Sequence, residues 1–385
     1  MKILVTGAKG FVGKNLCREL NNVKEGKCTL YPFLEDVEVF ECDLDTPYGE
    51  FRRFCKECDF VIHLAGVNRP EKPADFMAGN FGFTTILISA LKEYGNKAPI
   101  LMSSSIQAVL DNDYGKSKKA GEDYILNYGK ENDVKTYVYR LPNVFGKWCK
   151  PNYNSAVATF CNNIANDLPI TVNNEATELT LVYVDDVVRN FISAINGEVK
   201  VVDGYCKVDV EYKATLGRIV SLLNSFKKSR EDLTVADMSD EFVKKLYSTY
   251  LSYLPEGKFS YPLTMHEDYR GSFTEFLHTI NNGQVSVNVS KPHIVKGEHW
   301  HHTKNEKFLV VSGKGVIRFR KVDDDKVQEY FVSGDKLEVV DIPCGYTHNI
   351  ENLGDTDMVT IMWCNEIFNP EKPDTYFLKV GKENE

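Results

Sequence analysis

The chain has 385 residues, 43% of them hydrophobic, and this length and composition predict a globular protein of two domains. Its formal net charge of −9 argues against nucleic acid as the main partner and against an anionic membrane surface. Ten irregularly spaced cysteines predict a reduced protein, and we find neither a signal peptide nor a segment that could span a bilayer. We therefore expect a cytoplasmic protein without membrane insertion.

The chain opens with a short buried-strand pattern, residues 2–6, and a glycine-rich turn follows directly. Glycines in such a turn bend the chain tightly, admit a pyrophosphate close to the backbone and let the next helix pack on the strand. The amides at the helix start then bind the anion. A plain glycine-rich turn remains the alternative. The predicted cofactor contacts are Gly7, Lys9, Gly10, Phe11, Val12 and Gly13.

Further strand patterns, residues 37–42, 60–64 and 100–104, alternate with helical patterns around 78–94 and 114–128. This alternation predicts a parallel α/β sheet with helices on both faces, and ligands bind beyond the carboxyl ends of such strands. Asp43 could bind an adenine amino group there or be an ordinary turn acid, and His63 is expected to be packed inside its strand. The candidate cofactor residues at these ends are Asp43, Leu44, Leu64, Ala65 and Gly66.

Tyr114 and Lys118 stand one helical turn apart, so phenol and ammonium share one helix face. A nearby cation lowers the pKa of a phenol toward working pH. Tyr114 could then protonate an oxygen as hydride arrives at carbon. The preceding serines, residues 103–105, could polarise a substrate carbonyl or merely end a strand. A solvated helix face is the alternative for the Tyr–Lys pair.

Six motifs in chain order resemble the extended short-chain dehydrogenase/reductases. They are Gly7/Gly10/Gly13, His63-Leu-Ala-Gly66, Ser103-Ser-Ser105, Tyr114-x3-Lys118, Arg140-Leu-Pro-Asn143-Val-Phe-Gly146 and Leu181-Val-Tyr-Val-Asp185-Asp186. The resemblance covers roughly residues 1–250, and the last two motifs are similar to the branch that processes sugar nucleotides.

This resemblance implies a Rossmann-type domain in which Tyr114 is the acid/base and Lys118 activates it and contacts the ribose. It implies that Ser105 polarises the carbonyl, with Ser104 as the alternative. The residues implied to face a nucleotide sugar are Asn143, Lys150 and Asn154.

The choice of nicotinamide cofactor depends on the end of the second strand, where NAD enzymes usually carry an acid and NADP enzymes a base. We expect that position within residues 28–33, which offer neither. Lys9 in the glycine-rich loop could reach a 2′-phosphate. On this basis the sequence favours NADPH.

The C-terminal third has a different pattern. After predicted helices at residues 216–227 and 240–253, the Pro/Gly-containing residues 254–260 form a predicted linker between domains 1–253 and 261–385. Short, regularly spaced strands then predict an all-β sandwich or barrel. The predicted strands are residues 284–290, 307–311, 315–320, 327–332, 336–340 and 358–364.

Seven of the eight histidines lie in the last third of the chain. His299 and His301 would point to one face of an extended strand, Glu306 begins the next strand, and His348 could return one more imidazole. Three imidazoles and a carboxylate suit zinc or another divalent first-row ion. For the histidine run alone, an exposed polar strand is the alternative.

The spacings His299-x-His301-x4-Glu306-x6-Gly313 and Pro343-x-Gly345-x2-His348-x3-Asn352 resemble the two cupin motifs, although His293 stands where a glycine is expected. Asp268-Tyr-Arg270-Gly271-Ser-Phe273-Thr-Glu275-Phe resembles the opening of the dTDP-4-dehydrorhamnose 3,5-epimerases. That second resemblance implies a base at His299 that removes a proton beside a ketone. His299 is thus open between base and metal ligand, whereas His301, Glu306 and His348 are expected ligands.

Together the two halves resemble a family of bifunctional enzymes of capsular polysaccharide synthesis. The resemblance implies C3 epimerisation of a UDP-linked 4-keto-6-deoxy-N-acetylhexosamine, then NADPH-dependent C4 reduction to UDP-N-acetyl-6-deoxy-L-talosamine, a precursor of N-acetyl-L-fucosamine. A C4 ketone acidifies the C3 hydrogen, so epimerisation has to precede reduction. The alternatives are a single-step reductase with a structural or dimerising cupin, and a non-catalytic NADP-binding regulator. Because both domain classes often dimerise, we expect a homodimer.

Overall fold

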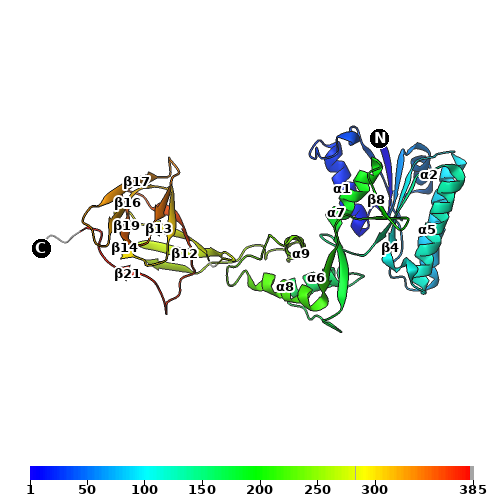
Figure 1. Cartoon of the computed structure of the whole chain (residues 1–385). Helices are drawn as coiled ribbons and strands as arrows, with labels where there is room; N and C mark the ends of the chain where they lie inside the picture. Colours follow the sequence, from blue (N-terminus) through cyan, green and yellow to red (C-terminus); the bar gives the residue numbers. More distant parts are fainter. Residues whose placement is uncertain (282, 382–385) are drawn as a thin grey trace. The chain divides into compact units, whose positions relative to one another are not determined.

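The computed structural model describes residues 1–281 and 283–381. The chain divides into two compact units, residues 1–224 with 241–255 and residues 225–240 with 256–385 (Figure 1). The chain crosses between the units more than once. It leaves the first unit for the last time after residue 255, which lies within the predicted linker, residues 254–260. The domain boundaries drawn from the sequence stay a prediction.

A seven-stranded sheet forms the centre of the first unit, in the order β2-β1-β3-β4-β5-β9-β8. Neighbouring strands are parallel except at the edge, where β8 pairs antiparallel with β9. The predicted parallel α/β fold is therefore confirmed. The strands are β1 (Lys2–Thr6), β2 (Glu38–Cys42), β3 (Phe60–His63), β4 (Ile100–Ser105), β5 (Thr136–Leu141), β8 (Lys200–Val202) and β9 (Tyr205–Lys207).

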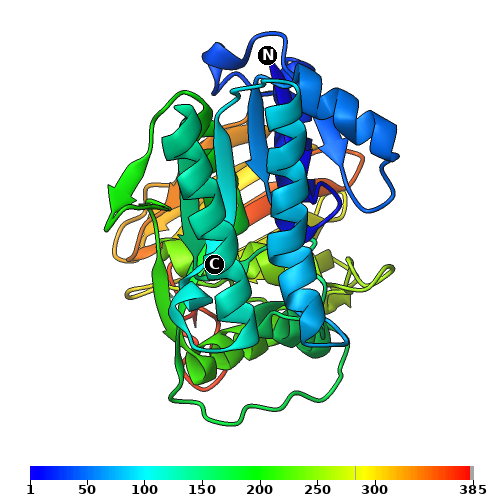
Figure 2. The same cartoon turned by 90° about the vertical axis from the view of Figure 1, so that its right-hand side faces the viewer.

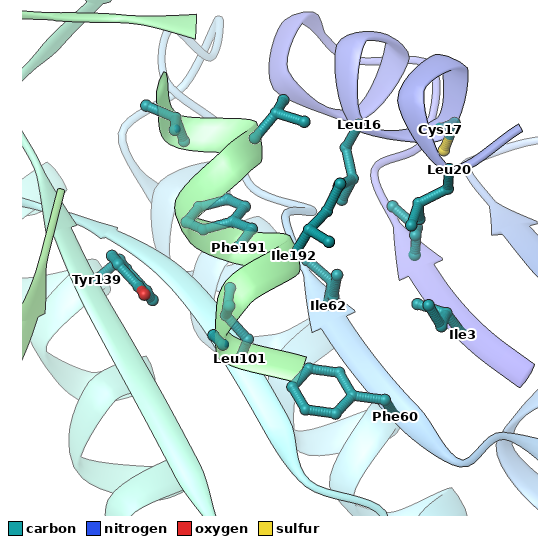
Figure 3. Packing of buried hydrophobic residues seen from close by; sticks show 14 of the residues in the cluster. Ile3, Leu16, Cys17, Leu20, Phe60, Ile62, Leu101, Tyr139, Phe191 and Ile192 are labelled. Atoms are coloured by element: carbon teal, nitrogen blue, oxygen red, sulfur yellow. The ribbon is translucent and has the colours of Figure 1, made fainter. Parts of the chain in front are cut away.

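Helices cover both faces of this sheet (Figure 1). α1 (Phe11–Lys24) and α7 (Val184–Ile195) pack on one face, where Leu16 and Phe191 meet side chains of the central strands (Figure 3). α4 (Phe83–Glu93) and α5 (Asp113–Asn132) lie side by side on the other face, next to α2 (Tyr48–Glu57) (Figure 2). Each fully buried Leu or Phe contributes roughly 1.5–3 kcal/mol, so these two apolar layers fix the sheet.

Among the described residues, 74–93 form the one helical stretch long and apolar enough to cross a membrane by length and composition. It consists of α3 (Ala74–Met77), a π-helical turn, η2 (Ala78–Gly82), and α4. Leu87, Ile88 and Leu91 of α4 pack into the core under the sheet, and Asn80 of η2 is buried. These buried residues account for part of the apolar character of the stretch, of which 33% is buried.

The rest of the first unit is a three-stranded sheet, β10-β7-β6, with three helices. Two short 3-10 helices belong to the region of the seven-stranded sheet: η1 (Pro32–Leu34) lies between α1 and β2, and η3 (Ile106–Val109) lies between β4 and α5. The strands and helices are β6 (Asn143–Phe145), β7 (Glu178–Tyr183), β10 (Tyr212–Thr215), α6 (Ala156–Ala165), α8 (Leu216–Lys228) and α9 (Glu241–Leu251).

One prediction about the first sheet is wrong. Residues 28–33, where we expected the end of the second strand, are loop followed by η1. Pro32 begins that turn, and proline has no backbone N–H for a strand ladder. The strand beside β1 is β2, with Cys42 opposite Thr6, so Asp43 is the residue at the end of the second strand.

The second unit is built from two antiparallel sheets, ordered β11-β12-β13-β20-β15-β18 and β17-β16-β19-β14-β21. Apolar residues from both sheets, among them Phe308, Ile317 and Ile350, form one core, so the predicted all-β fold is confirmed. The strands are β11 (Met265–Asp268), β12 (Gly271–His278), β13 (Gln284–Ser290), β14 (Val295–Trp300), β15 (Glu306–Ser312), β16 (Lys314–Lys321), β17 (Gln328–Ser333), β18 (Val339–Ile342), β19 (Tyr346–Asn352), β20 (Met358–Cys364) and β21 (Tyr376–Phe377).

Candidate active sites of the two units

The glycine-rich loop after β1 has a shape that requires glycine. Gly7 has φ +70°, and a Cβ there would lie 2.7 Å from the backbone nitrogen of Ala65. A Cβ on Gly13 would lie 2.1 Å from the carbonyl oxygen of Gly7, so helix and loop are in direct contact. Gly10 caps α1, which begins at Phe11, and first-turn amides have no partner within their helix. The loop therefore has the shape expected of an anion cradle, and anion binding by it stays a prediction.

The loop after β3 lies against the same glycines and against α5. The Ala65 amide donates to Thr6 Oγ1 at 3.3 Å, and a Cβ on Gly66 would lie 3.0 Å from Lys118 Nζ. His63 is buried, with Nδ1 2.7 Å from Thr6 Oγ1 and Nε2 2.9 Å from Thr84 Oγ1. Burial, and secondarily Lys118, lowers the pKa of His63 to about 3. His63 is thus a neutral, packed histidine, as expected from its place in the strand.

Tyr114 lies in the first turn of α5, whose N-cap Asn112 accepts a hydrogen bond from the Gly115 amide at 2.7 Å. The rings of Tyr114 and Phe76 pack edge to face, with their centroids 5.6 Å apart. Burial raises the pKa of Tyr114, and the hydrogen bond from Ser105 offsets only part of that rise. The expectation that a cation lowers this pKa is wrong, because burial dominates and the group that lowers the pKa is the Ser105 hydroxyl.

Lys118 is 6% exposed, and burial lowers its pKa to about 8, partly offset by the carboxylate of Glu122. It therefore still carries its proton at neutral pH. The two candidate serines have different neighbours. Ser104 Oγ donates to Glu122 at 2.6 Å, whereas the Ser105 hydroxyl is the group that lowers the pKa of the Tyr114 phenol. The geometry favours Ser105 over Ser104 as the group beside Tyr114.

Asn80 belongs to this site and was missed in the sequence. Its Oδ1 accepts the Val67 amide at 2.9 Å, and its Nδ2 donates to the Val67 carbonyl and to Ser117 Oγ, both at 3.0 Å. Asn80 thereby ties the loop after β3 to α5. A polar residue in an apolar helix was the available signal, and the π-helical turn that holds it is a feature common at functional sites.

The predicted sugar contacts lie in two places. Asn143 is exposed in β6 and donates to the Thr180 carbonyl at 3.2 Å. The Lys150 ammonium lies 5.4 Å from the ring centre of Tyr153. Asn154, the residue after Tyr153, is exposed. Arg69 donates to the Tyr153 carbonyl at 2.6 Å, which joins the loop after β3 to this turn. Sugar binding by these residues stays a prediction.

In the second unit, His299, His301, Glu306 and His348 come together, with one potential ligand atom of each within 4.8 Å of all the others. A bulge between β14 and β19 directs His299: Gly297 has φ +102° and Glu298 φ +62°. The Glu298 carboxylate turns elsewhere and accepts the Val380 amide at 2.6 Å. The four residues that the sequence spacing selected thus form one cluster.

The cluster fits a divalent metal. His301 Nδ1 lies 2.6 Å from the Asp374 carbonyl oxygen, so the N–H is on Nδ1 and the Nε2 lone pair faces the cluster. His301 Nε2 and Glu306 Oε2 are buried without a hydrogen-bond partner among the described residues. Glu306 Oε2 lies 3.6 Å from His301 Nε2 and 3.3 Å from His348 Nε2. A metal ion between these atoms would satisfy them.

The charge states of the cluster residues also suit a divalent metal ion. Burial alone would raise the pKa of Glu306, but the neighbouring imidazoles of His301 and His348 together outweigh it and lower the pKa. Burial, then His348 and His301, lowers the pKa of His299 to about 4. The result is an ionised carboxylate and a neutral imidazole, the forms in which both bind metals.

A cavity of about 600 Å³ opens onto this cluster. Its lining includes His299, Glu306 and His348, together with Lys296 and Arg270. Lys296 Nζ donates to Asn288 Oδ1 and to the Val289 carbonyl, both at 2.8 Å, and burial lowers its pKa. Sequence reasoning missed Lys296, although a lysine three residues before His299 in a predicted motif was a usable signal.

Comparison with known proteins gives a family for each unit and for the whole chain. Residues 3–204 match the NAD dependent epimerase/dehydratase family, and residues 266–376 match the polysaccharide biosynthesis C-terminal domain. The chain is 44% identical over 382 residues to a UDP-2-acetamido-2,6-beta-L-arabino-hexul-4-ose reductase from Pseudomonas aeruginosa, covering 99% of this chain and 100% of the relative.

Among solved structures, the capsular polysaccharide assembling protein CapF from Staphylococcus aureus has a TM-score of 0.91 and 56% identity, over 98% of this chain and all of that one. The UDP-glucuronic acid 4-epimerase from Bacillus cereus, in complex with NAD, has a TM-score of 0.51 and 19% identity over 66% of this chain and 96% of that one, which shows the fold alone. By full-length similarity in sequence and structure, the chain belongs to the CapF family of capsular polysaccharide proteins.

Proposed function

We propose that this protein is a bifunctional enzyme of nucleotide-sugar metabolism. The second unit epimerises C3 of a UDP-4-keto-6-deoxy-N-acetylhexosamine, and the first unit then reduces the C4 ketone to UDP-N-acetyl-6-deoxy-L-talosamine, on the route to N-acetyl-L-fucosamine for capsule or O-antigen. The observation that carries the reductase is the placement of Tyr114 in the first turn of α5, where the Ser105 hydroxyl acts on its pKa, one turn from buried Lys118. The Pseudomonas aeruginosa relative, named as a reductase of a UDP-linked 4-ulose, supports the substrate class.

In the reduction, each residue acts on the C4 oxygen. Ser105 donates a hydrogen bond to the ketone, and Tyr114 transfers its proton to the oxygen as charge develops there. The Lys118 ammonium stabilises the phenolate that Tyr114 becomes. A reduced nicotinamide dinucleotide, bound at the glycine-rich loop, supplies the hydride. Sequence alone favoured NADPH for this role, on the strength of Lys9.

In the epimerisation, we assign the base to His299, because it lines the cavity while His301 is buried behind it at 1% exposure. The ketone at C4 makes the C3 hydrogen acidic, and Lys296 in the cavity wall can stabilise the resulting enolate. His301, Glu306 and His348 would hold a divalent metal, for which the donor set suits zinc. Such an ion, when bound, supplies either a Lewis acid or structural support.

The reductase assignment is tested by cofactor oxidation with the UDP-4-keto sugar. We expect Tyr114→Phe to lose at least 100-fold in kcat, a loss typical of a missing general acid. Tyr124→Phe is the matched control, since it removes a phenol from the same helix, where the ring packs on Phe81. Equal rates for wild type and Tyr114→Phe would remove Tyr114 from the mechanism.

We further propose that the enzyme works in the cytoplasm as a homodimer. Its ten cysteines all lie among the described residues and form no disulfide, which supports a reducing compartment. Light scattering after size exclusion tests the dimer, and a monomeric mass at micromolar concentration would contradict it.

A further inference from the structure

Asp374 lies beside the metal-binding cluster, in the segment between β20 and β21 of the second unit. Its backbone carbonyl accepts the Nδ1–H of His301 at 2.6 Å. A carbonyl can only accept, so this contact keeps the proton of the neutral imidazole on Nδ1 and leaves the Nε2 lone pair for an ion. Removing a group that orients a metal-binding imidazole in this way typically weakens metal binding by about 10–100-fold.

The Asp374 side chain holds that carbonyl in place. Its carboxylate accepts the backbone amides of the three residues after His301. The distances are 3.0 Å from His302 and 2.9 Å from both Thr303 and Lys304, and Thr303 Oγ1 adds a contact at 3.1 Å. An ionised carboxylate has about four acceptor sites, so these contacts use its capacity within the chain. The Asp374 carboxylate therefore braces the turn after β14.

The same segment also supports the bulge that directs His299. β21 pairs with the end of β14 that carries this histidine. The Leu378 amide donates to the Glu298 carbonyl at 2.9 Å, and the Val380 amide donates to the carboxylate of the same glutamate at 2.6 Å. We call residues 374–380 the C-terminal strap. The strap thus contacts the backbone beside two of the three histidines of the cluster.

A buried arginine anchors the far end of the C-terminal strap. Arg320 of β16 is 7% exposed, and its guanidinium donates to the Val380 carbonyl at 2.8 Å and to the Lys379 carbonyl at 2.7 Å. A further bond runs to the Asp324 carbonyl at 2.9 Å. A buried charge that loses its hydrogen bonds is costly, so these contacts tie the strap to β16. Asp374 then fixes the near end of the strap at the cluster.

We propose that Asp374 is a positioning residue for the metal centre. Its carboxylate fixes the turn after β14, so that its own carbonyl holds His301 in the tautomer and orientation that bind a metal. The inference rests on the proposed function only in assuming that the cluster binds a divalent ion. The rival interpretation is that Asp374 merely stabilises the fold of the second unit. The two interpretations differ in the zinc affinity of the folded protein.

The test is the zinc Kd of the metal-stripped full chain, measured by competition with a chromophoric chelator. We expect Asp374→Asn to weaken zinc binding by about 10–100-fold. Asparagine keeps the size of the side chain and tolerates the φ of +40° at this position, but its NH2 group cannot accept an amide. Asp374→Gly also suits a positive φ and removes the carboxylate altogether, so it should weaken binding at least as much.

Thr375→Ala is the control on the same strap. Thr375 is exposed, and its hydroxyl donates to the Pro373 carbonyl at 2.8 Å, so we expect its zinc Kd to stay within about twofold of wild type. The visible absorption of the cobalt(II)-loaded proteins reports ligand geometry, and it should change in Asp374→Asn but not in Thr375→Ala.

Melting temperatures of the metal-free proteins report the stability of the fold separately. A lower melting temperature in Asp374→Asn and Asp374→Gly, with the zinc Kd and cobalt spectrum of wild type, would overturn the inference and leave the metal centre standing. Failure of the wild type to bind zinc would count against the proposed metal centre itself, and the inference would fall with it.

Discussion

Glu122 holds Arg140 through two hydrogen bonds, Nε to Oε1 at 2.9 Å and Nη2 to Oε2 at 2.7 Å, while Glu122 itself is fully buried. The pair joins α5 to β5, and Ser104 of β4 adds a third bond to the same carboxylate. It therefore fixes the helix that carries Tyr114 and Lys118 relative to the strand that carries Ser105.

Glu122→Ala leaves the guanidinium of Arg140, whose side chain is 18% exposed, without its charged partner, and an unsatisfied group of this kind costs about 1–3 kcal/mol. We expect Glu122→Ala to lose that much of the free energy of unfolding of the first unit, measured by hydrogen exchange of amides in β4 and β5. Glu131→Ala, on the exposed side of the same helix, is the control and should lose less than about 0.5 kcal/mol. Similar losses in both variants would show that the buried pair is not what stabilises the site.

Reductase activity should fall as the pH rises through about 8. Burial lowers the pKa of Lys118 to about 8, so its ammonium is present below that pH and is lost above it. Burial moves the pKa of Tyr114 in the other direction, above its ordinary value, so Tyr114 does not account for a limb near 8. A kcat profile measured from pH 6 to about pH 10 would show this limb. A profile flat across that range would contradict the role of Lys118.

Acid should destabilise the first unit through His63. Its pKa is about 3 in the folded protein and about 6.5 when unfolded, so the unfolded chain binds the extra proton between these values. Stability therefore falls as the pH falls below 6.5, by about 2 kcal/mol at pH 5. Hydrogen exchange of β1 and β3 amides at pH 7 and 5 measures the loss, and His63→Asn should reduce it. The same loss in wild type and His63→Asn would refute this origin.

Metal content should depend on the four-residue cluster. We expect about one equivalent of zinc or another divalent first-row ion in the purified protein by plasma mass spectrometry, and its loss in His301→Ala. His302→Ala is the control, because His302 packs on Trp300 and Tyr376 outside the cluster. Chelation should also lower the melting temperature of the second unit in wild type. Equal metal content in the two variants would exclude the site.

Local patterns in the sequence predicted the pairing of Tyr114 with Lys118 and the four cluster residues, because a helical turn and a strand alternation determine which side chains share a face. They did not reveal Asn80 or Lys296, whose partners lie on other elements. The rise in the pKa of Tyr114 comes from burial, which spacing does not report.

The end of the second strand was misplaced for a related reason. Residues 28–33 are partly apolar, as a strand would be, but only pairing with β1 decides which segment is the second strand. That pairing selects Glu38–Cys42 and so makes Asp43, not residues 28–33, the residue at the end of the second strand. Strand pairing is a long-range property, which local patterns in the sequence do not report.

The most direct test of a two-step enzyme is proton NMR of the UDP-4-keto-6-deoxy-N-acetylhexosamine with the protein in deuterium oxide, without a reduced cofactor. We expect the C3 proton signal to disappear with wild type and with Tyr114→Phe, and to persist with His299→Ala. A C3 signal that persists with wild type, while added reduced cofactor is still consumed, would contradict epimerisation and leave a single-step reductase.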